Sequence, residues 1–262
     1  MKLRVISALV IVLVLVPMLL LGGVIFNLGT IILALLALRE LLKVSQTKKE
    51  LPMFINFISY IVLTLIIFSS VNISDMTFAI DFRILSALAL VFLVPVVLYH
   101  DRKKYDIISA FYLLGGVFFL GISFSLVIIL RNISLLLVIY LFLITVITDS
   151  YAYIIGSLIG KHKLLEMISP NKTWEGMIFG TVFGTIVATT FYVVAIDSTS
   201  IITPFLITLF LSILGQFGDL VFSAIKRHYG VKDFSNIIPG HGGILDRFDS
   251  IIFVMLGYIF FI

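Results

Sequence analysis

The sequence predicts an all-α polytopic membrane protein with about nine spanning helices. Of its 262 residues, 61% are hydrophobic and only 12% are charged, whereas soluble domains are nearer half apolar and a quarter charged. A soluble fold of this length must turn many residues to water and cannot hide so much apolar surface. In addition, the apolar residues gather in long runs, and the basic residues between those runs follow a one-sided pattern.

Nine apolar runs, most of about the 20 residues that a spanning helix needs, account for most of the chain. The runs are 4–21, 24–43, 53–70, 84–99, 107–130, 133–158, 175–196, 201–227 and 248–262. The first run resembles a signal peptide, but no small-x-small cleavage site follows it, so we interpret it as an uncleaved span. Gly22 and Gly23 form a tight break after it. The last run is short, and it either tilts less or extends back to Ile244.

The Lys and Arg residues indicate the orientation. With nine spans, 16 of the 18 basic residues fall on the side of the N-terminus: Lys2, Arg4, Arg39, Lys43, Lys48, Lys49, Arg102, Lys103, Lys104, Lys161, Lys163, Lys172, Lys226, Arg227, Lys232 and Arg247. Arg83 and Arg131 fall on the other side. By the positive-inside rule the N-terminus is cytoplasmic and the C-terminus faces out. We therefore expect a multi-pass protein of the cytoplasmic membrane.

The polar loops divide the chain by function. We expect an N-terminal region of five spans over 1–132 and a C-terminal catalytic region of four spans over 133–262. The cytoplasmic loops 159–174 and 228–247 of the second region are rich in Gly, Lys, His and Pro. The chain has no cysteine, which excludes disulfides, thiolate metal sites and a cysteine nucleophile.

Two carboxylates stand out inside apolar runs: Asp149, well inside its run, and Asp219, nearer the cytoplasmic end of its own. An ionised carboxylate facing lipid costs several kcal/mol, about 3 on insertion scales. One interpretation is a structural pair with Lys or Arg from a neighbouring helix. The other is a hydrated, cation-binding pocket that opens to the cytoplasm.

The densest cluster of chemical groups lies in 219–249. The run Gly240-His241-Gly242-Gly243 allows a close backbone approach to a ligand, and a helix is expected to start near Ile244, where its free N–H groups favour phosphate. Asp246 and Asp249 lie three residues apart on one face of that helix. Two carboxylates beside a phosphate-binding turn suit Mg²⁺. Four basic side chains could supply charge for phosphate oxygens: Lys226, Arg227, Lys232 and Arg247. His241 suits phosphate binding or proton transfer, or it is a loop histidine bonded to the backbone. The alternative is a solvated surface loop that contacts lipid head groups.

A second polar segment spans 149–176. Ser169 and Pro170 predict a turn before a helix. Thr173 could cap that helix or bind a phosphate. Three lysines could clamp a triphosphate: Lys161, Lys163 and Lys172. The loop does not match the Walker A pattern, because its glycines and lysine are wrongly spaced.

The stretch from Ser223 to Asp249, read as Ser-Ala-Ile-Lys-Arg-x4-Lys-Asp-Phe-Ser-Asn-Ile-Ile-Pro-Gly-His-Gly-Gly-Ile-Leu-Asp-Arg-Phe-Asp, resembles the phosphatidate cytidylyltransferases (CDP-diacylglycerol synthases). Asp149-x-x-Ala-Tyr and Ser169-Pro-Asn-Lys-Thr-Trp-Glu-Gly are similar to that family as well. The resemblance covers roughly the last 45% of the chain. The N-terminal half is similar only in having several apolar spans.

The resemblance implies an enzyme that joins CTP and phosphatidic acid to give CDP-diacylglycerol and pyrophosphate, with Mg²⁺. Four candidate acids exceed the one or two carboxylates of a usual Mg²⁺ site, so we expect two divalent sites. The expected metal ligands are first Asp219 and Asp246, then Asp249 and Asp149. The phosphate-binding groups are then Lys226, Arg227, Lys232, His241 and Arg247, with Ser223, Gly242 and Gly243 beside them. Ser169, Lys172 and Thr173 would help to hold CTP. We expect membrane lipids as further partners and no binding of nucleic acid. A homodimer is implied by the resemblance alone.

Two other classes of function remain open. A cation-coupled transporter could use Asp149 and Asp219 as an ion pathway, although the charges lie on one side and no inverted repeat is seen. Another membrane enzyme that handles phosphates is the second class. Such an enzyme could be a CTP-dependent polyprenol kinase or a CDP-alcohol phosphotransferase, although the D-G-x-x-A-R run of the latter is absent.

Overall fold

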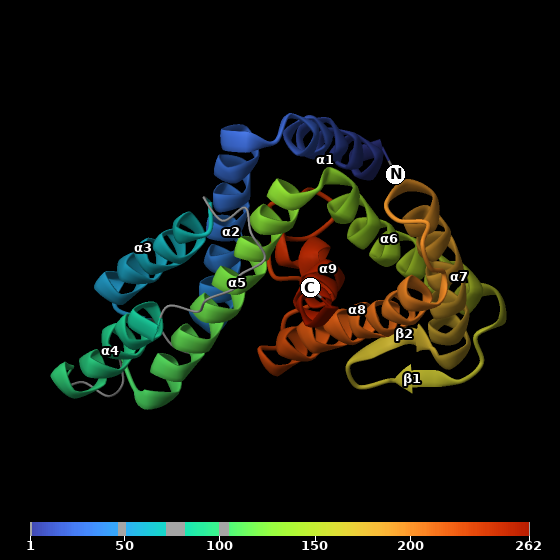
Figure 1. Cartoon of the computed structure of the whole chain (residues 1–262). Coiled ribbons are helices and arrows are strands. Elements are labelled where there is room, and N and C mark those ends of the chain that lie inside the picture. The colour runs from blue at the N-terminus through green and yellow to red at the C-terminus, as the bar shows by residue number, and fades with distance from the viewer. Residues whose placement is uncertain (1, 47–50, 72–81, 100–104, 262) are drawn as a thin grey trace. The chain divides into compact units, whose positions relative to one another are not determined.

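The computed structural model describes residues 2–46, 51–71, 82–99 and 105–261 (Figure 1). These ranges contain nine α-helices: α1 (Lys2–Leu21), α2 (Gly23–Gln46), α3 (Met53–Ser69), α4 (Phe82–Leu98), α5 (Ile107–Ile133), α6 (Leu135–Ile159), α7 (Trp174–Ala195), α8 (Ile202–His228) and α9 (Leu245–Tyr258). One helix coincides with each predicted apolar run. The prediction of an all-α fold is confirmed.

Five helices in the described part of the chain are long and apolar enough to cross a bilayer: α2, α5, α6, α7 and α8. Shorter apolar stretches lie in α1, α3 and α4. The chain is therefore a polytopic membrane protein. The predicted cytoplasmic N-terminus stays a prediction, and part of the charge pattern behind it lies outside the described residues: Lys48, Lys49, Arg102, Lys103 and Lys104.

The loop between α6 and α7 differs from the sequence prediction. Strands β1 (Lys163–Leu165) and β2 (Ser169–Thr173) form an antiparallel hairpin there. The turn lies at 166–168, so the predicted turn at Ser169 and Pro170 is wrong. Because both strands of a two-stranded hairpin are edge strands, a proline without an N–H group is tolerated in β2.

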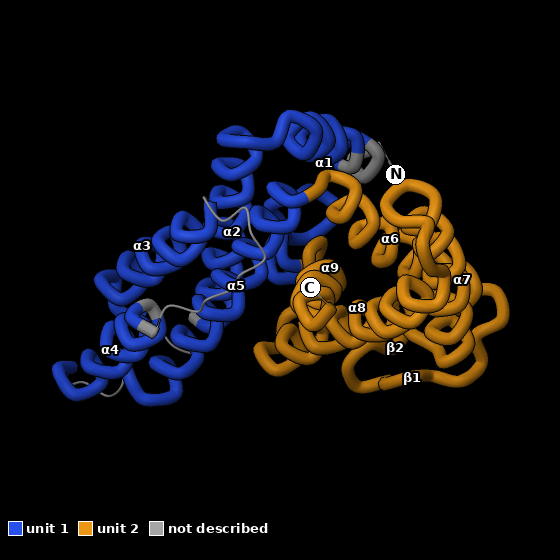
Figure 2. Tube along the Cα trace, viewed as in Figure 1, with its two compact units in different colours: residues 1–133, 233–245 blue, residues 134–232, 246–262 orange. Residues whose placement is uncertain are grey.

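The chain forms two compact units (Figure 2). Unit 1 contains residues 1–133 and 233–245, and unit 2 contains residues 134–232 and 246–262. A short segment before α9 thus leaves the C-terminal half of the sequence and packs with the N-terminal helices. The expected catalytic role of the region 133–262 stays a prediction.

Within unit 1, α5 packs against α2 and α3 through buried side chains that include Leu113 and Leu120. The predicted break between the first two spans is present, with positive φ at Gly22 and Gly23. Arg131 Nε donates to the carbonyl of Leu19 at 2.7 Å. Arg131 therefore satisfies carbonyl groups at the end of α1 that the helix itself leaves without partners.

Unit 2 is built on a very close contact between α6 and α7. A Cβ atom at Gly180 would lie 2.6 Å from the carbonyl oxygen of Thr148, and one at Gly176 would lie 2.5 Å from that of Ala152. Small residues at this spacing let two membrane helices approach closely. Helix α8 joins the pair through a hydrogen bond of 2.7 Å between Thr148 and Ser212.

Because of this contact, we expect a glycine-to-alanine substitution to destabilise the protein between α6 and α7 but not at an open position of another helix. Gly180→Ala should lower the free energy of unfolding by about 1–3 kcal/mol, because the methyl group would overlap backbone of α6. Gly115→Ala in α5 is the matched control, since nothing lies within 4 Å of the position of its Cβ. Thermal unfolding in detergent measures both, and equal midpoints would contradict the packing described.

Candidate active site

A buried ion pair joins α8 to α9. Lys226 Nζ lies 2.6 Å from Asp246 Oδ1, and the two side chains are only 10% and 4% exposed. A buried charge without a partner is strongly destabilising, so each group depends on the other. The sequence prediction placed both residues in one site, and the structure brings them into direct contact.

A second ion pair joins the hairpin to α8. Lys172 Nζ in β2 lies 2.7 Å from Asp219 Oδ2, and it also donates to the carbonyl of Gln216 at 3.5 Å. The Ser223 hydroxyl donates to the other oxygen, Asp219 Oδ1, at 3.2 Å. Both carboxylate oxygens of Asp219 are thus engaged by residues that were predicted to bind substrate.

The remaining two predicted acids of this group lie close enough to Asp219 to interact with it electrostatically. Asp149 in α6 and Asp249 in α9 each interact electrostatically with Asp219 in α8. Asp149 also interacts with Lys172, and Asp249 with Lys226. Three helices of unit 2 therefore contribute carboxylates, with two lysines set against them.

Glycines in α8 explain how α8 and α9 come so close. A Cβ atom at Gly218 would lie 2.7 Å from the carbonyl oxygen of Asp249, and one at Gly215 would lie 3.0 Å from Val254 Cγ2. No side chain larger than hydrogen fits at Gly218 without moving α9. The residue next to Gly218 is Asp219, so this glycine sets how near the acids of the two helices can lie.

Thr173 holds the hairpin to the start of α7. Its hydroxyl oxygen accepts a hydrogen bond from the N–H of Gly176 at 3.2 Å, which makes it the N-cap. A Cβ atom at Gly160 would lie 2.6 Å from this oxygen. Of the two roles predicted for Thr173, the structure shows the cap. The capped junction also fixes the neighbouring Lys172.

Other predicted phosphate-binding residues lie at the surface of unit 2. Arg227 donates from Nε to the carbonyl of Ile168 at 3.3 Å and from Nη1 to that of Val231 at 3.0 Å. Lys232 and Arg247 are exposed, and Ser169 is partly buried in β2. Their predicted contacts with substrate stay predictions.

The glycine-rich turn before α9 belongs to unit 1. Gly240 and Gly242 have φ of 78° and 82°, a conformation that other residues rarely adopt. The N–H of Ile238 donates to the carbonyl of Gly242 and that of His241 donates to Ile238, both at 2.9 Å. The backbone of the turn therefore accounts for two of its glycines, and the phosphate-binding roles of His241 and Gly242 stay predictions.

Sequence reasoning missed a third carboxylate in an apolar run, Glu40 in α2. It is only 1% exposed, and it accepts hydrogen bonds from the N–H groups of Ile244 and Leu245, each at 2.8 Å. A Cβ atom at Gly243 would lie 2.4 Å from Glu40 Oε1. A lone Glu inside the run 24–43 was the available signal, because intramembrane acids are rare.

The acids of unit 2 fit a hard divalent cation by donor type. Mg²⁺ takes oxygen ligands and is held by one or two carboxylates together with substrate phosphates. Among the residues that the structure describes, no three His, Asp or Glu side chains form a ready cluster for a metal. Lys172 and Lys226 neutralise Asp219 and Asp246 instead. A metal bound here would therefore share these acids with the lysines and draw further oxygens from substrate.

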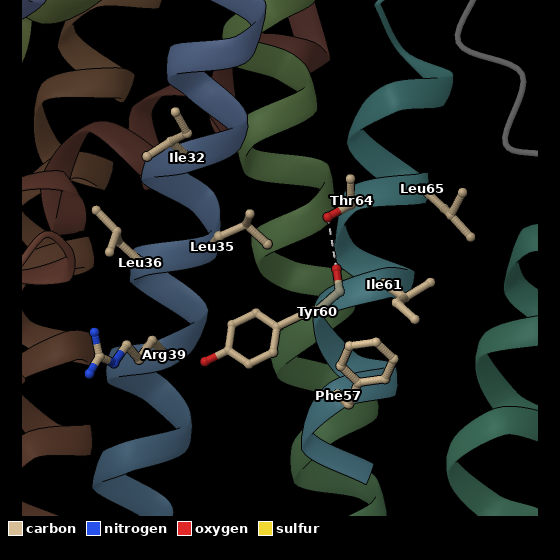
Figure 3. Close-up of a pocket in the computed structure, with 9 residues that line it drawn as sticks. All are labelled: Ile32, Leu35, Leu36, Arg39, Phe57, Tyr60, Ile61, Thr64 and Leu65. Carbon is tan, nitrogen blue, oxygen red and sulfur yellow. Dashed lines mark hydrogen bonds between the residues drawn. The ribbon is translucent and has the colours of Figure 1, made fainter. Parts of the chain in front are cut away.

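A groove of about 690 Å³ in unit 1 has a different chemistry (Figure 3). It lies between α2 and α3 and is lined by Ile32, Leu35, Leu36, Arg39, Phe57, Tyr60, Ile61, Thr64 and Leu65. None of these residues is acidic, and Arg39 is the one charged group among them. The groove has the character of a lipid-contact surface rather than of a reaction site.

Acids and lysines of this kind are able to align and neutralise phosphate groups. The comparisons name the family. The chain belongs to the Cytidylyltransferase family, whose family model matches residues 2–262. It is 39% identical over 256 residues to a protein of Staphylococcus haemolyticus named phosphatidate cytidylyltransferase, covering 97% of this chain and 96% of that one. Proteins of the same name from Staphylococcus saprophyticus and Staphylococcus aureus are 37% and 38% identical over the same shares.

Because Lys226 and Asp246 pair, we expect their substitutions to have non-additive effects on the free energy of unfolding. Lys226→Met or Asp246→Leu alone should lower the free energy of unfolding by about 3–5 kcal/mol, since each leaves a buried charge without its partner. The double variant should cost much less than the sum. Thermal unfolding in detergent measures all three, with the exposed Lys163→Met as a control. Additive losses would contradict the pairing.

Proposed function

We propose that this protein is a phosphatidate cytidylyltransferase, which condenses CTP with phosphatidic acid to give CDP-diacylglycerol and pyrophosphate. The observation that carries the proposal is similarity over nearly the whole length to proteins of that name. The assembled acids and lysines of unit 2 support it, because the substrates are a lipid phosphate and a nucleoside triphosphate. A transporter or a polyprenol kinase is less well supported, since neither follows from membership of this family.

The chemistry requires charge neutralisation more than a strong base. An oxygen of the phosphatidate phosphate attacks the α-phosphorus of CTP and forms a new P–O bond. The bond from the α-phosphorus to the bridging oxygen of the β-phosphate breaks, and pyrophosphate leaves with that electron pair. The nucleophile is already anionic, so the protein must chiefly bring two polyanions together and align them.

We assign the acids of unit 2 to divalent cations. Asp219 and Asp246 are the first ligands, with Asp249 and Asp149 next, in an arrangement of two Mg²⁺ sites. When bound, Mg²⁺ would neutralise charge on the phosphate oxygens. Carboxylates on three helices would supply the negative charge that attracts the cations.

The lysines are assigned to the substrate phosphates. Lys172 and Lys226 each contact a carboxylate in the structure, and a bound phosphate would compete with that carboxylate for the ammonium group. Ser223 is placed to donate a hydrogen bond at the same centre. The remaining phosphate contacts are assigned from the resemblance: Ser169, Arg227, Lys232, His241, Gly242 and Arg247.

The site is proposed to face the cytoplasm, where CTP is available. The positive-inside pattern supports a cytoplasmic N-terminus and places the loops 159–174 and 228–247 on that side. The relatives are bacterial proteins, which supports the cell membrane as the location. A homodimer rests on the resemblance alone.

Asp219→Asn tests the assignment of the acids. Turnover should fall at least about 100-fold, because a group aimed at charge in the transition state contributes that much. Detergent-purified protein is given labelled CTP, phosphatidate and Mg²⁺, and label in the organic phase is counted. Asp197→Asn, at an exposed acid outside the helices, is the matched control. Near-normal turnover by Asp219→Asn would remove this residue from the site.

Chelation tests the need for a divalent cation. We expect EDTA to abolish label transfer and added Mg²⁺ to restore it, because lysines alone cannot neutralise both substrates and the acids. The measurement is the rate against free Mg²⁺ concentration. Full turnover in excess EDTA would overturn the metal assignment without touching the family assignment.

A further inference from the structure

Glu40 caps a helix from far away in the sequence. Helix α9 begins at Leu245, and the residue before it, Ile244, has no polar side chain to accept from the free N–H groups of the first turn. Glu40 Oε1 accepts from the N–H of Ile244 and Glu40 Oε2 from that of Leu245, both at 2.8 Å. A carboxylate some 204 residues earlier in the chain thus does what a local Ser or Asp usually does.

The segment before α9 is shaped around this carboxylate. Gly243 has no room for a Cβ atom, because Glu40 Oε1 would lie 2.4 Å from it. Ser235 donates its hydroxyl to the same oxygen at 2.6 Å, and Phe234 beside it is only 2% exposed. Three donors and one glycine therefore converge on one buried side chain.

The next residue along the chain after Leu245 is Asp246. Its carboxylate is buried against Lys226 and is assigned above to a metal. The two hydrogen bonds from Ile244 and Leu245 to Glu40 order the start of α9, and with it the backbone of Asp246. A group that orients a ligand commonly changes activity or metal affinity about 10–100-fold when it is replaced.

We propose that Glu40 is a positioning residue for the reaction: by binding the N–H groups of Ile244 and Leu245 it sets the place of Asp246. This inference rests on the proposed function. It makes one side chain of α2 responsible for the order of the first turn of α9. It also gives Gly243 a reason other than phosphate binding, namely clearance for a carboxylate.

Glu40→Gln is the primary test, since it keeps the size of the side chain and replaces one acceptor with a donor. We expect kcat to fall about 10–100-fold, while KM for CTP and for phosphatidate changes less than about threefold. The half-saturating Mg²⁺ concentration should rise. Glu166→Gln, an identical change at an exposed position of the hairpin turn, should behave as the wild type.

A readout independent of activity accompanies the kinetics. Hydrogen–deuterium exchange should speed up at the amides of Ile244 and Leu245 in Glu40→Gln, and the thermal midpoint should stay close to that of the wild type. Unchanged kcat would overturn the proposal. So would a loss of kcat matched by an equal loss of folded protein. Absence of product from the wild type and from Glu166→Gln would instead overturn the proposed function itself.

A double-mutant cycle tests the contact directly. Gly243→Ala should lower kcat because its methyl group displaces the Glu40 carboxylate. In a Glu40→Ala background the same change should add little, since the obstructed group is gone. Effects that multiply in the double variant would show that the two residues act separately, contrary to the proposal.

Discussion

Carboxylates that lie within apolar helices, and must be paired there, are the constraint on which the rest of this structure depends. In a bilayer an unpaired carboxylate is expensive, so each acid needs a cation, a lysine or backbone N–H groups. Asp246 is held by Lys226, Asp219 by Lys172, and Glu40 by backbone and Ser235. The lysines that stabilise the acids in this structure are also the groups that phosphates would bind.

Glycine residues allow the helices that carry these side chains to approach one another closely. At Gly180 and Gly218 the backbone of one helix nearly touches that of the next, which places polar side chains of different helices within bonding distance. At Gly243 the neighbour is a carboxylate instead of a backbone. The missing Cβ atom thus allows close helix packing in unit 2, and in unit 1 it leaves space for the Glu40 carboxylate that binds the N–H groups of Ile244 and Leu245.

The sequence predicted the helices well because hydropathy and length alone decide where a chain can cross a bilayer. It also predicted that the polar residues of 149–249 belong together. Within unit 2 the structure pairs Asp219 with Lys172 and, separately, Asp246 with Lys226. It missed the hairpin before α7, because a short strand pair carries little periodic signal. It missed the role of Glu40 as well. A lone Glu in the run 24–43 was visible, but its partners, two backbone N–H groups and Ser235, lie about 200 residues away in the sequence and form no motif with it.

The proposed phosphate chemistry requires the acids of unit 2 to bind divalent cations. Mn²⁺ can stand in for Mg²⁺, and electron paramagnetic resonance reports the free ion as purified protein is titrated. We expect saturable Mn²⁺ binding to the wild type, which Asp219→Asn greatly weakens and Asp197→Asn leaves unchanged. Binding that is absent from the wild type, or that survives in Asp219→Asn, would contradict it.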